Sequence, residues 1–111
     1  MSHKVTHRIC SLNDLEENWG EVALIGDHQY AIFRTHDDRV YVTDHQDPNS
    51  GSLVIARGIV GEKDGKRTVT SPLYKEIYDL ETGECLSGAD YVLPVYEVEN
   101  KDGEIFVLLD A

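Results

Sequence analysis

The sequence predicts an all-β fold, a single antiparallel barrel or sandwich, and three observations support this. Val (11), Ile (7) and Tyr (6) together outnumber Leu (10), and these side chains pack well on a pleated surface. Short apolar runs recur along the chain with turn residues between them. The length of 111 residues fits one domain, so we expect one structural unit with its core across residues 5–109.

Nine strands are expected, each a short apolar run bounded by turn residues. They cover residues 5–10, 22–25, 30–34, 40–43, 59–61, 68–70, 77–80, 95–98 and 105–109. Turn signals rich in Gly and Asp lie at residues 26–27, 36–38, 63–65, 81–83 and 101–103. These residue types tolerate positive φ or bond their own backbone, so each signal predicts a hairpin connection.

Three stretches depart from this strand pattern. Residues 11–15 (SLNDL) carry a possible N-cap in Ser11, with Asp14 three positions on, and predict a helical turn or two. Residues 44–52, here called the first loop, and residues 71–76, the second loop, are rich in loop-forming residues. Loops on a rigid scaffold commonly carry recognition, so these two loops are the candidates for a working surface.

The charge and composition exclude several classes of function. A net charge of -11 opposes binding to nucleic acid or to an anionic membrane, because both require clustered Lys and Arg. No apolar run approaches the roughly 20 residues of a membrane span, and the first ten residues lack the apolar stretch of a signal peptide, so we expect a cytoplasmic protein. Cys10 and Cys85 are far apart and match no redox or metal spacing, which argues against a disulfide framework.

The second loop and the residues after it resemble a Rieske domain, above all the YDLETG stretch at residues 78–83. In Rieske ferredoxins, C-x-H in the first loop and C-P-x-H in the second hold a 2Fe-2S cluster. The corresponding positions of this chain are Asp47, Asn49, Ser71 and Tyr74. A Rieske centre needs two thiolates and two imidazoles, so the resemblance implies a Rieske-like barrel or sandwich without the cluster.

Within the Rieske-like proteins, the chain resembles the small subunit of the cytoplasmic NAD(P)H-dependent nitrite reductase from about residue 9 to residue 107. The resemblance rests on VALIG (22–26), AIFR (31–34), DP (47–48), SG (50–51), RGIVG (57–61), SPLYK (71–75) and LPVY (93–96), in that order. It implies an accessory chain. The large subunit of that family carries sirohaem, a 4Fe-4S cluster, FAD and the NAD(P)H site, and reduces nitrite to ammonium. Asn49 stands where the family usually has an aromatic residue, so the packing of the first loop is expected to depart from that of the family.

Three functions are compared. The leading one is a cofactor-free subunit that docks on the nitrite reductase large subunit, belongs to an oxidoreductase and is inactive alone. A Rieske ferredoxin-type electron carrier would need an iron centre that these residues do not build. A Rieske-like protein-binding module of another oxidoreductase is the third. Self-association through a patch meant for the partner stays open.

The candidate residues for partner binding are Arg57, Ser71, Leu73, Tyr74 and Lys75. For Tyr74 there are two alternatives, since its ring could fill the space that a cluster would occupy or could anchor a partner. No catalytic, cofactor-binding or metal-binding residue is expected. Asp44, His45 and Asp47 are interpreted as parts of a turn, and His3 and His7 as residues of a frayed terminus.

Overall fold

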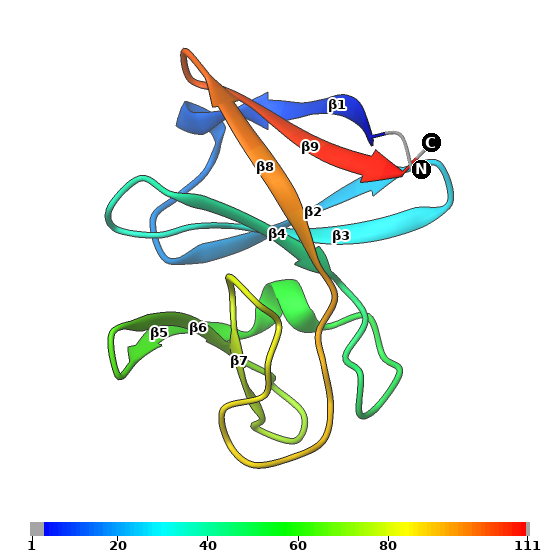
Figure 1. The fold of residues 1–111 in the computed structure, drawn as a ribbon, viewed down its shortest axis with the longest axis vertical. Coiled ribbons are helices and arrows are strands. Elements are labelled where there is room, and N and C mark those ends of the chain that lie inside the picture. The colour runs from blue at the N-terminus through cyan, green and yellow to red at the C-terminus, as the bar shows by residue number, and fades with distance from the viewer. Residues whose placement is uncertain (1–3, 111) are drawn as a thin grey trace.

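A computed structural model describes residues 4–110, and nine strands and two short 3₁₀ helices follow one another along them (Figure 1). The strands are β1 (Lys4–Ser11), β2 (Trp19–Ile25), β3 (His28–Arg34), β4 (Val40–Asp44), β5 (Ile59–Lys63), β6 (Lys66–Thr70), β7 (Ile77–Asp79), β8 (Val95–Lys101) and β9 (Glu104–Asp110). The helices are η1 (Leu12–Asp14) and η2 (Ile55–Arg57). All nine expected strands are therefore confirmed.

The strands form two antiparallel sheets, placed one above the other in Figure 1. The larger sheet has six strands in the order β1-β9-β8-β4-β3-β2 and curls into a half-barrel, so that β1 and β2 are its edges. The smaller sheet has the order β5-β6-β7. The first and second loops extend from these sheets at the end of the molecule that is lowest in Figure 1.

Strand β3 separates two apolar cores, because both of its faces are buried. Tyr30 and Ile32 pack with Leu15, Val42 and Val107 inside the half-barrel. Ala31 and Phe33 point the opposite way, into a second core shared with η2 and the smaller sheet; its other buried members are Ile55, Ala56, Val69, Tyr78, Leu80, Cys85 and Leu93. The alternation of side chains along one strand thus joins the two sheets into one domain.

Two hairpins close on the residues that the turn signals predicted. Asp64 and Gly65 join β5 to β6, and Asp102 and Gly103 join β8 to β9. All four have positive φ, between 52° and 87°. Consecutive residues with positive φ match the right-handed twist of the flanking strands, and Asp-Gly adopts this conformation readily.

The helical prediction for residues 11–15 is confirmed as the single turn η1. The backbone N–H of Ser11 donates to the carboxylate of Asp14 at 2.9 Å. Helix η2 was not predicted. It lies against β2, where a Cβ added to Gly20 would collide with the carbonyl oxygen of Ala56. Glycine at position 20 therefore permits the close approach of η2 to the edge of the larger sheet.

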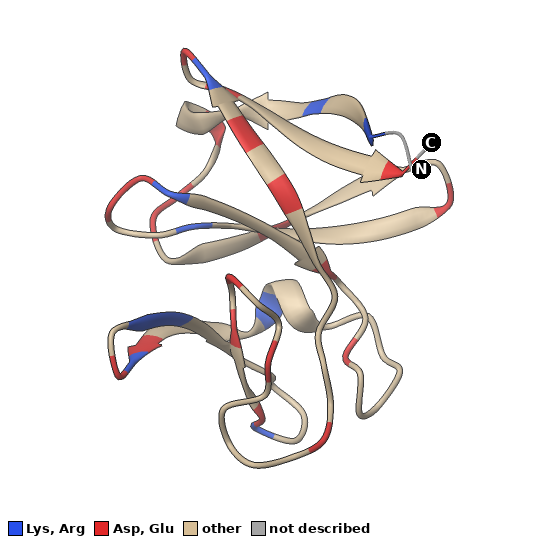
Figure 2. Ribbon diagram, viewed as in Figure 1, with Lys and Arg blue, Asp and Glu red and all other residues tan. Residues whose placement is uncertain are grey.

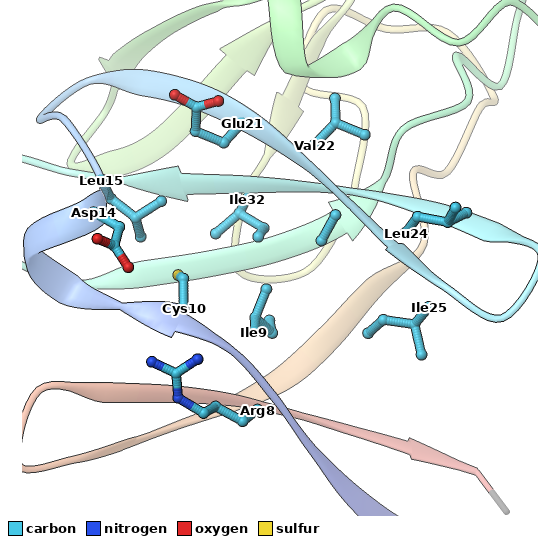
Figure 3. Close-up of a pocket in the computed structure, with 11 residues that line it drawn as sticks. Arg8, Ile9, Cys10, Asp14, Leu15, Glu21, Val22, Leu24, Ile25 and Ile32 are labelled. Atoms are coloured by element: carbon cyan, nitrogen blue, oxygen red, sulfur yellow. The ribbon is translucent and has the colours of Figure 1, made fainter.

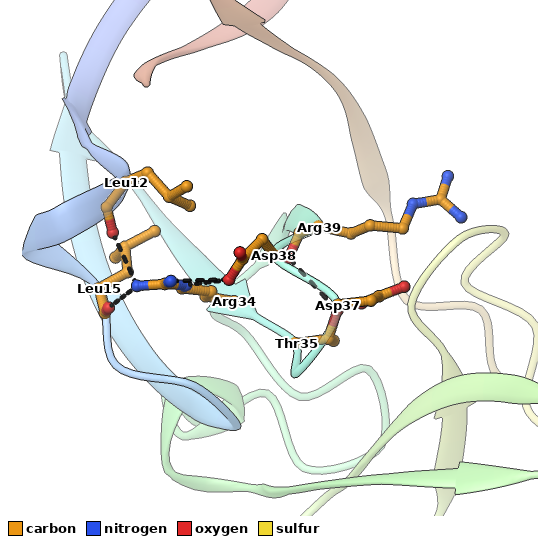
Figure 4. Close-up of polar contacts among 7 residues, drawn as sticks. All are labelled: Leu12, Leu15, Arg34, Thr35, Asp37, Asp38 and Arg39. Carbon is orange, nitrogen blue, oxygen red and sulfur yellow. Dashed lines mark hydrogen bonds and ion pairs between the residues drawn. The ribbon is translucent and has the colours of Figure 1, made fainter. Parts of the chain in front are cut away.

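Arg34 anchors the segment that leads into β2 (Figure 4). Its guanidinium donates to the carbonyl oxygens of Leu15 at 2.9 Å and Leu12 at 3.3 Å, and pairs with Asp38 at 2.7 Å. The residue just beyond, Thr35, bonds the Asp37 carboxylate within the same turn. These contacts fix the β3–β4 turn against η1 and the segment that leads into β2.

The excess acidic charge is not gathered on one face. Asp and Glu occur in both sheets and in most of the turns (Figure 2). This distribution favours a general solubilising role for the charge over a single acidic docking face. Within residues 4–110, no helix is long and apolar enough to cross a membrane.

Candidate functional site

The two loops that correspond to the Rieske ligand loops are joined directly to each other. The Ser71 hydroxyl donates to Oδ2 of Asp47 at 2.5 Å, although the two residues are 24 positions apart. A second link runs from Nδ2 of Asn49 to Oε1 of Glu76 at 2.8 Å. Three of the four ligand-equivalent positions therefore take part in hydrogen bonds that hold the loops together.

Asp47 and Ser71 form the inner half of this set, and both are fully buried. The second carboxylate oxygen of Asp47 accepts from the backbone N–H of Asn49 at 2.9 Å, so both oxygens are used. The Ser71 backbone accepts from the Lys75 N–H at 3.2 Å and donates to Glu76, which shapes the second loop. Burial removes Ser71 from the residues that can touch a partner, and its role is to position the loop.

These residues do not fit a 2Fe-2S cluster. A Rieske centre binds through two cysteine thiolates and two histidine imidazoles, and the four positions supply a carboxylate, an amide, a hydroxyl and a phenol. The Asp47 carboxylate is also committed to Ser71 and Asn49, within the space where the two loops meet. Cys10 and Cys85 lie outside both loops, in β1 and after β7, and supply no replacement thiolate.

Leu73, Tyr74 and Lys75 are the exposed rim of the second loop. The Tyr74 side chain is 59% exposed, which rules out the alternative that its ring fills the space a cluster would occupy. Lys75 has a φ of 63°, and its ammonium donates to the carbonyl of Pro72 at 3.1 Å. An apolar side chain, an aromatic ring and a cation are thus presented together to the surroundings.

The buried aromatic residue near the two loops is Tyr78, in β7. Its ring is fully buried, and no group within residues 4–110 bonds its hydroxyl. Burial raises the pKa of the Tyr78 phenol, and the nearby charges of Asp47 and Glu76 raise it further. The phenol therefore stays neutral, and its ring packs in the core next to the two loops.

Arg57 lies apart from the rim, in a groove between β2 and η2. The groove has a volume of about 580 Å³ and is lined by Trp19, Gly20, Glu21, Val22, His45, Leu53, Ala56, Arg57 and Gly58. Trp19, Val22 and Leu53 are each about half exposed. Sequence reasoning missed this groove as a unit, although Trp19 and Gly20, just before the predicted strand at residues 22–25, were a usable signal.

A second cleft, of about 450 Å³, lies between the two sheet edges β1 and β2 (Figure 3). Ile9, Ile25 and Ile32 point into it, and Arg8, Asp14 and Glu21 surround it. Its apolar floor continues into the core of the half-barrel. We interpret this cleft as the incompletely closed seam of the barrel.

The acidic residues of the first loop have protein partners of their own. The Asp44 carboxylate is bonded by His28 at 2.6 Å and by the Tyr96 hydroxyl at 2.5 Å. Across the described part of the chain, no group of three or more His, Cys, Asp and Glu is arranged to hold a metal ion. Of the two histidines expected in a frayed terminus, His3 lies outside the described residues, and the expectation is wrong for His7, which lies in β1 and pairs with Val107.

A curled antiparallel sheet, a second three-stranded sheet and two apposed loops define a Rieske-like domain. Residues 6–108 match the family described as "Rieske-like [2Fe-2S] domain". The solution structure of the Escherichia coli protein NirD superposes with a TM-score of 0.83 at 35% identity, covering 98% of each chain.

Comparison with individual relatives identifies the family of this chain within the Rieske-like domains. The nitrite reductase (NADH) small subunit of Escherichia coli K12 is 38% identical over 98 residues, which cover 87% of this chain and 91% of the relative. The chain therefore belongs to the family of nitrite reductase small subunits. A nitrite reductase [NAD(P)H] large subunit from Klebsiella oxytoca is 33% identical over 99 residues, 89% of this chain but 10% of that protein.

Proposed function

We propose that this chain is the accessory small subunit of an assimilatory NAD(P)H-dependent nitrite reductase and that it docks on the large subunit. The observation that carries the proposal is the 38% identity to a nitrite reductase small subunit over nearly the whole chain. The Klebsiella oxytoca large subunit supports it, because a region similar to this chain is part of that larger polypeptide. In that protein the similar region is covalently joined to the rest of the large subunit.

The contribution of this chain is structural recognition and not cluster-based electron transfer. Three of its four ligand-equivalent residues, Asp47, Asn49 and Ser71, are engaged in hydrogen bonds within and between the two loops. The resemblance assigns sirohaem, a 4Fe-4S cluster, FAD and NAD(P)H to the large subunit. The small chain then binds that subunit, supports its shape and is inactive alone.

The exposed rim of the second loop is the first candidate docking surface. Leu73 and Tyr74 are about half exposed, and Lys75 adds a positive charge beside them. An aromatic ring that buries apolar area while its hydroxyl remains at the edge is a common interface anchor. We place the protein in the cytoplasm, in keeping with two cysteines that remain free thiols.

The test is reconstitution with a purified large subunit. We expect the two chains to copurify, and the small chain to raise nitrite-dependent NAD(P)H oxidation or the stability of the large subunit. The small chain alone should show no turnover, and elemental analysis after anaerobic purification should find no stoichiometric iron. Failure to associate, or about two irons per small chain, would overturn the proposal.

A further inference from the structure

The groove between β2 and η2 gathers exposed apolar surface next to polar donors. Trp19 is 58% exposed, Val22 49% and Leu53 48%, and all three line the groove. Single exposed apolar side chains are ordinary on a protein surface, but several in one concave place mark an interaction site. Gly20, where no Cβ can be fitted, keeps η2 against β2 and so maintains both walls.

Arg57 is an unsatisfied cation in this groove. Arg8, Arg34 and Arg67 contact carboxylates between 2.7 and 3.5 Å, and Arg39 lies over the Tyr41 ring. Arg57 has no carboxylate within 4.0 Å and no side-chain hydrogen bond among residues 4–110. Of the five arginines, Arg57 is the one to which the described residues supply neither a carboxylate nor an aromatic ring, although the chain carries an excess of eleven negative charges.

His45 supplies a second donor from the floor of the groove. Its side chain is 5% exposed, and its Nδ1 accepts the backbone N–H of Ala56 at 3.1 Å. Since Nδ1 is an acceptor, the neutral ring carries its proton on Nε2. Burial, followed by the charge of Arg57, lowers the pKa of this imidazole and keeps it neutral. No described residue accepts the Nε2 proton.

We infer that this groove receives a segment of the nitrite reductase large subunit in which a carboxylate stands next to an apolar side chain. The carboxylate bonds the Arg57 guanidinium and the His45 Nε2–H, and the apolar side chain packs between Trp19 and Leu53. Charge complementarity places the carboxylate on the η2 wall, because Glu21 on the β2 wall would repel it. The inference rests on the proposed function and gives it a docking site distinct from the rim.

The choice of occupant follows from charge and from the relatives. A second copy of this chain would bring another strongly acidic surface, and the two copies would repel each other outside the groove. The Klebsiella oxytoca relative holds a domain of this kind within the large polypeptide itself, so segments of the large chain are within reach. A carboxylate-bearing segment of the large subunit therefore matches the groove better than a second copy does.

The experiment compares five variants of the full chain for affinity to the purified large subunit. Arg57→Glu should weaken association at least about tenfold, because it replaces the attraction by repulsion at a contact removed from water. Trp19→Ala should weaken it about five- to thirtyfold. The matched controls are Arg39→Glu, at an arginine that instead lies 5.8 Å from the centre of the Tyr41 ring, and Val5→Ala, at an exposed residue of β1. Both controls should stay within about twofold of the wild type.

The possible results distinguish failure of the groove inference from failure of the proposed accessory function. Thermal unfolding should show Arg57→Glu folded, and Arg57→Gln, with a smaller loss of affinity, repeats the test without a new charge. Equal binding by Arg57→Glu and Arg39→Glu would overturn the groove inference while leaving the accessory function in place. A wild-type chain that does not bind the large subunit would overturn both. Self-association of the wild type that Arg57→Glu abolishes would identify a second copy as the occupant and also overturn the inference.

Discussion

The four residues at the Rieske ligand positions differ in burial, with an inner pair at the cysteine positions and an outer pair at the histidine positions. Asp47 and Ser71, at the cysteine positions, are fully buried and bonded to each other. Tyr74, at a histidine position, is exposed, and Asn49, at the other, is half-buried and bonded to Glu76. The inner half thus replaces a metal-mediated link between the loops by a direct hydrogen bond, and the rim is available for recognition. The predictions below test this division between stability and binding.

The largest expected effect separates the two tyrosines of this region. Tyr78→Ala should lower the free energy of unfolding by about 3–5 kcal/mol, because it removes a large buried ring and leaves a cavity. Tyr74→Ala should change it by less than about 0.5 kcal/mol, as is usual for an exposed side chain. Urea denaturation of both variants measures the difference. Comparable losses would contradict the division between a buried support and an exposed rim.

Removal of the Asp47–Ser71 hydrogen bond between the loops should have the next largest effect on stability. Asp47→Ala leaves the Ser71 hydroxyl and the Asn49 N–H without their acceptor in a buried place, so we expect a loss of about 2–3 kcal/mol. Asp90→Ala, at an exposed aspartate, is the control and should change stability little. Denaturant midpoints decide the comparison, and equal stability of the two variants would show that the link between the loops contributes nothing.

The rim should matter for association. If the second loop docks on the large subunit, Tyr74→Ala should weaken binding by about 1–3 kcal/mol, the range of interface anchors. Calorimetric titration with the large subunit measures this, and the stability data above serve as its control. A Tyr74→Ala chain that binds like the wild type would place the interface elsewhere on the domain.

Removal of the Tyr78 hydroxyl alone should change the free energy of unfolding less than Tyr78→Ala does, and in the opposite direction. Within residues 4–110 this buried group has no hydrogen-bond partner, so its removal costs no protein–protein bond. Tyr78→Phe should therefore leave stability unchanged or raise it by up to about 1 kcal/mol. A clear destabilisation in urea denaturation would show that the hydroxyl takes part in the packing of the loops.

Acidification should destabilise the fold through His45. Burial, with the charge of Arg57 as a second cause, lowers the pKa of this imidazole in the folded chain. The unfolded chain therefore binds more protons as the pH falls below the ordinary value of about 6.5, and the free energy of unfolding decreases there. Above that pH the contribution is fully present. Denaturation of the wild type and His45→Gln from about pH 7.5 to about pH 5 should show a smaller loss in the variant; parallel curves would contradict this.

Local patterns were sufficient to predict the strands and the hairpin turns. β-Branched and aromatic runs predicted all nine strands, and Asp-Gly pairs predicted hairpins whose positive φ values the structure confirms. These features depend on residues close together in the chain, for which side-chain shape and turn conformation are sufficient causes. Helix η2 was missed, because three residues carry no helical period and their position depends on packing against Gly20.

The sequence alone determined the strand order along the chain, the turns and the identity of the four ligand-equivalent residues. Only the tertiary structure decided which of them are buried, since the Asp47–Ser71 bond joins two loops brought together by separate sheets. It also decided that Tyr78 and not Tyr74 is the buried ring, and that Arg57, His45 and Trp19 share a groove. Burial and charge pairing are properties of contacts between distant segments, and local sequence patterns do not specify those contacts.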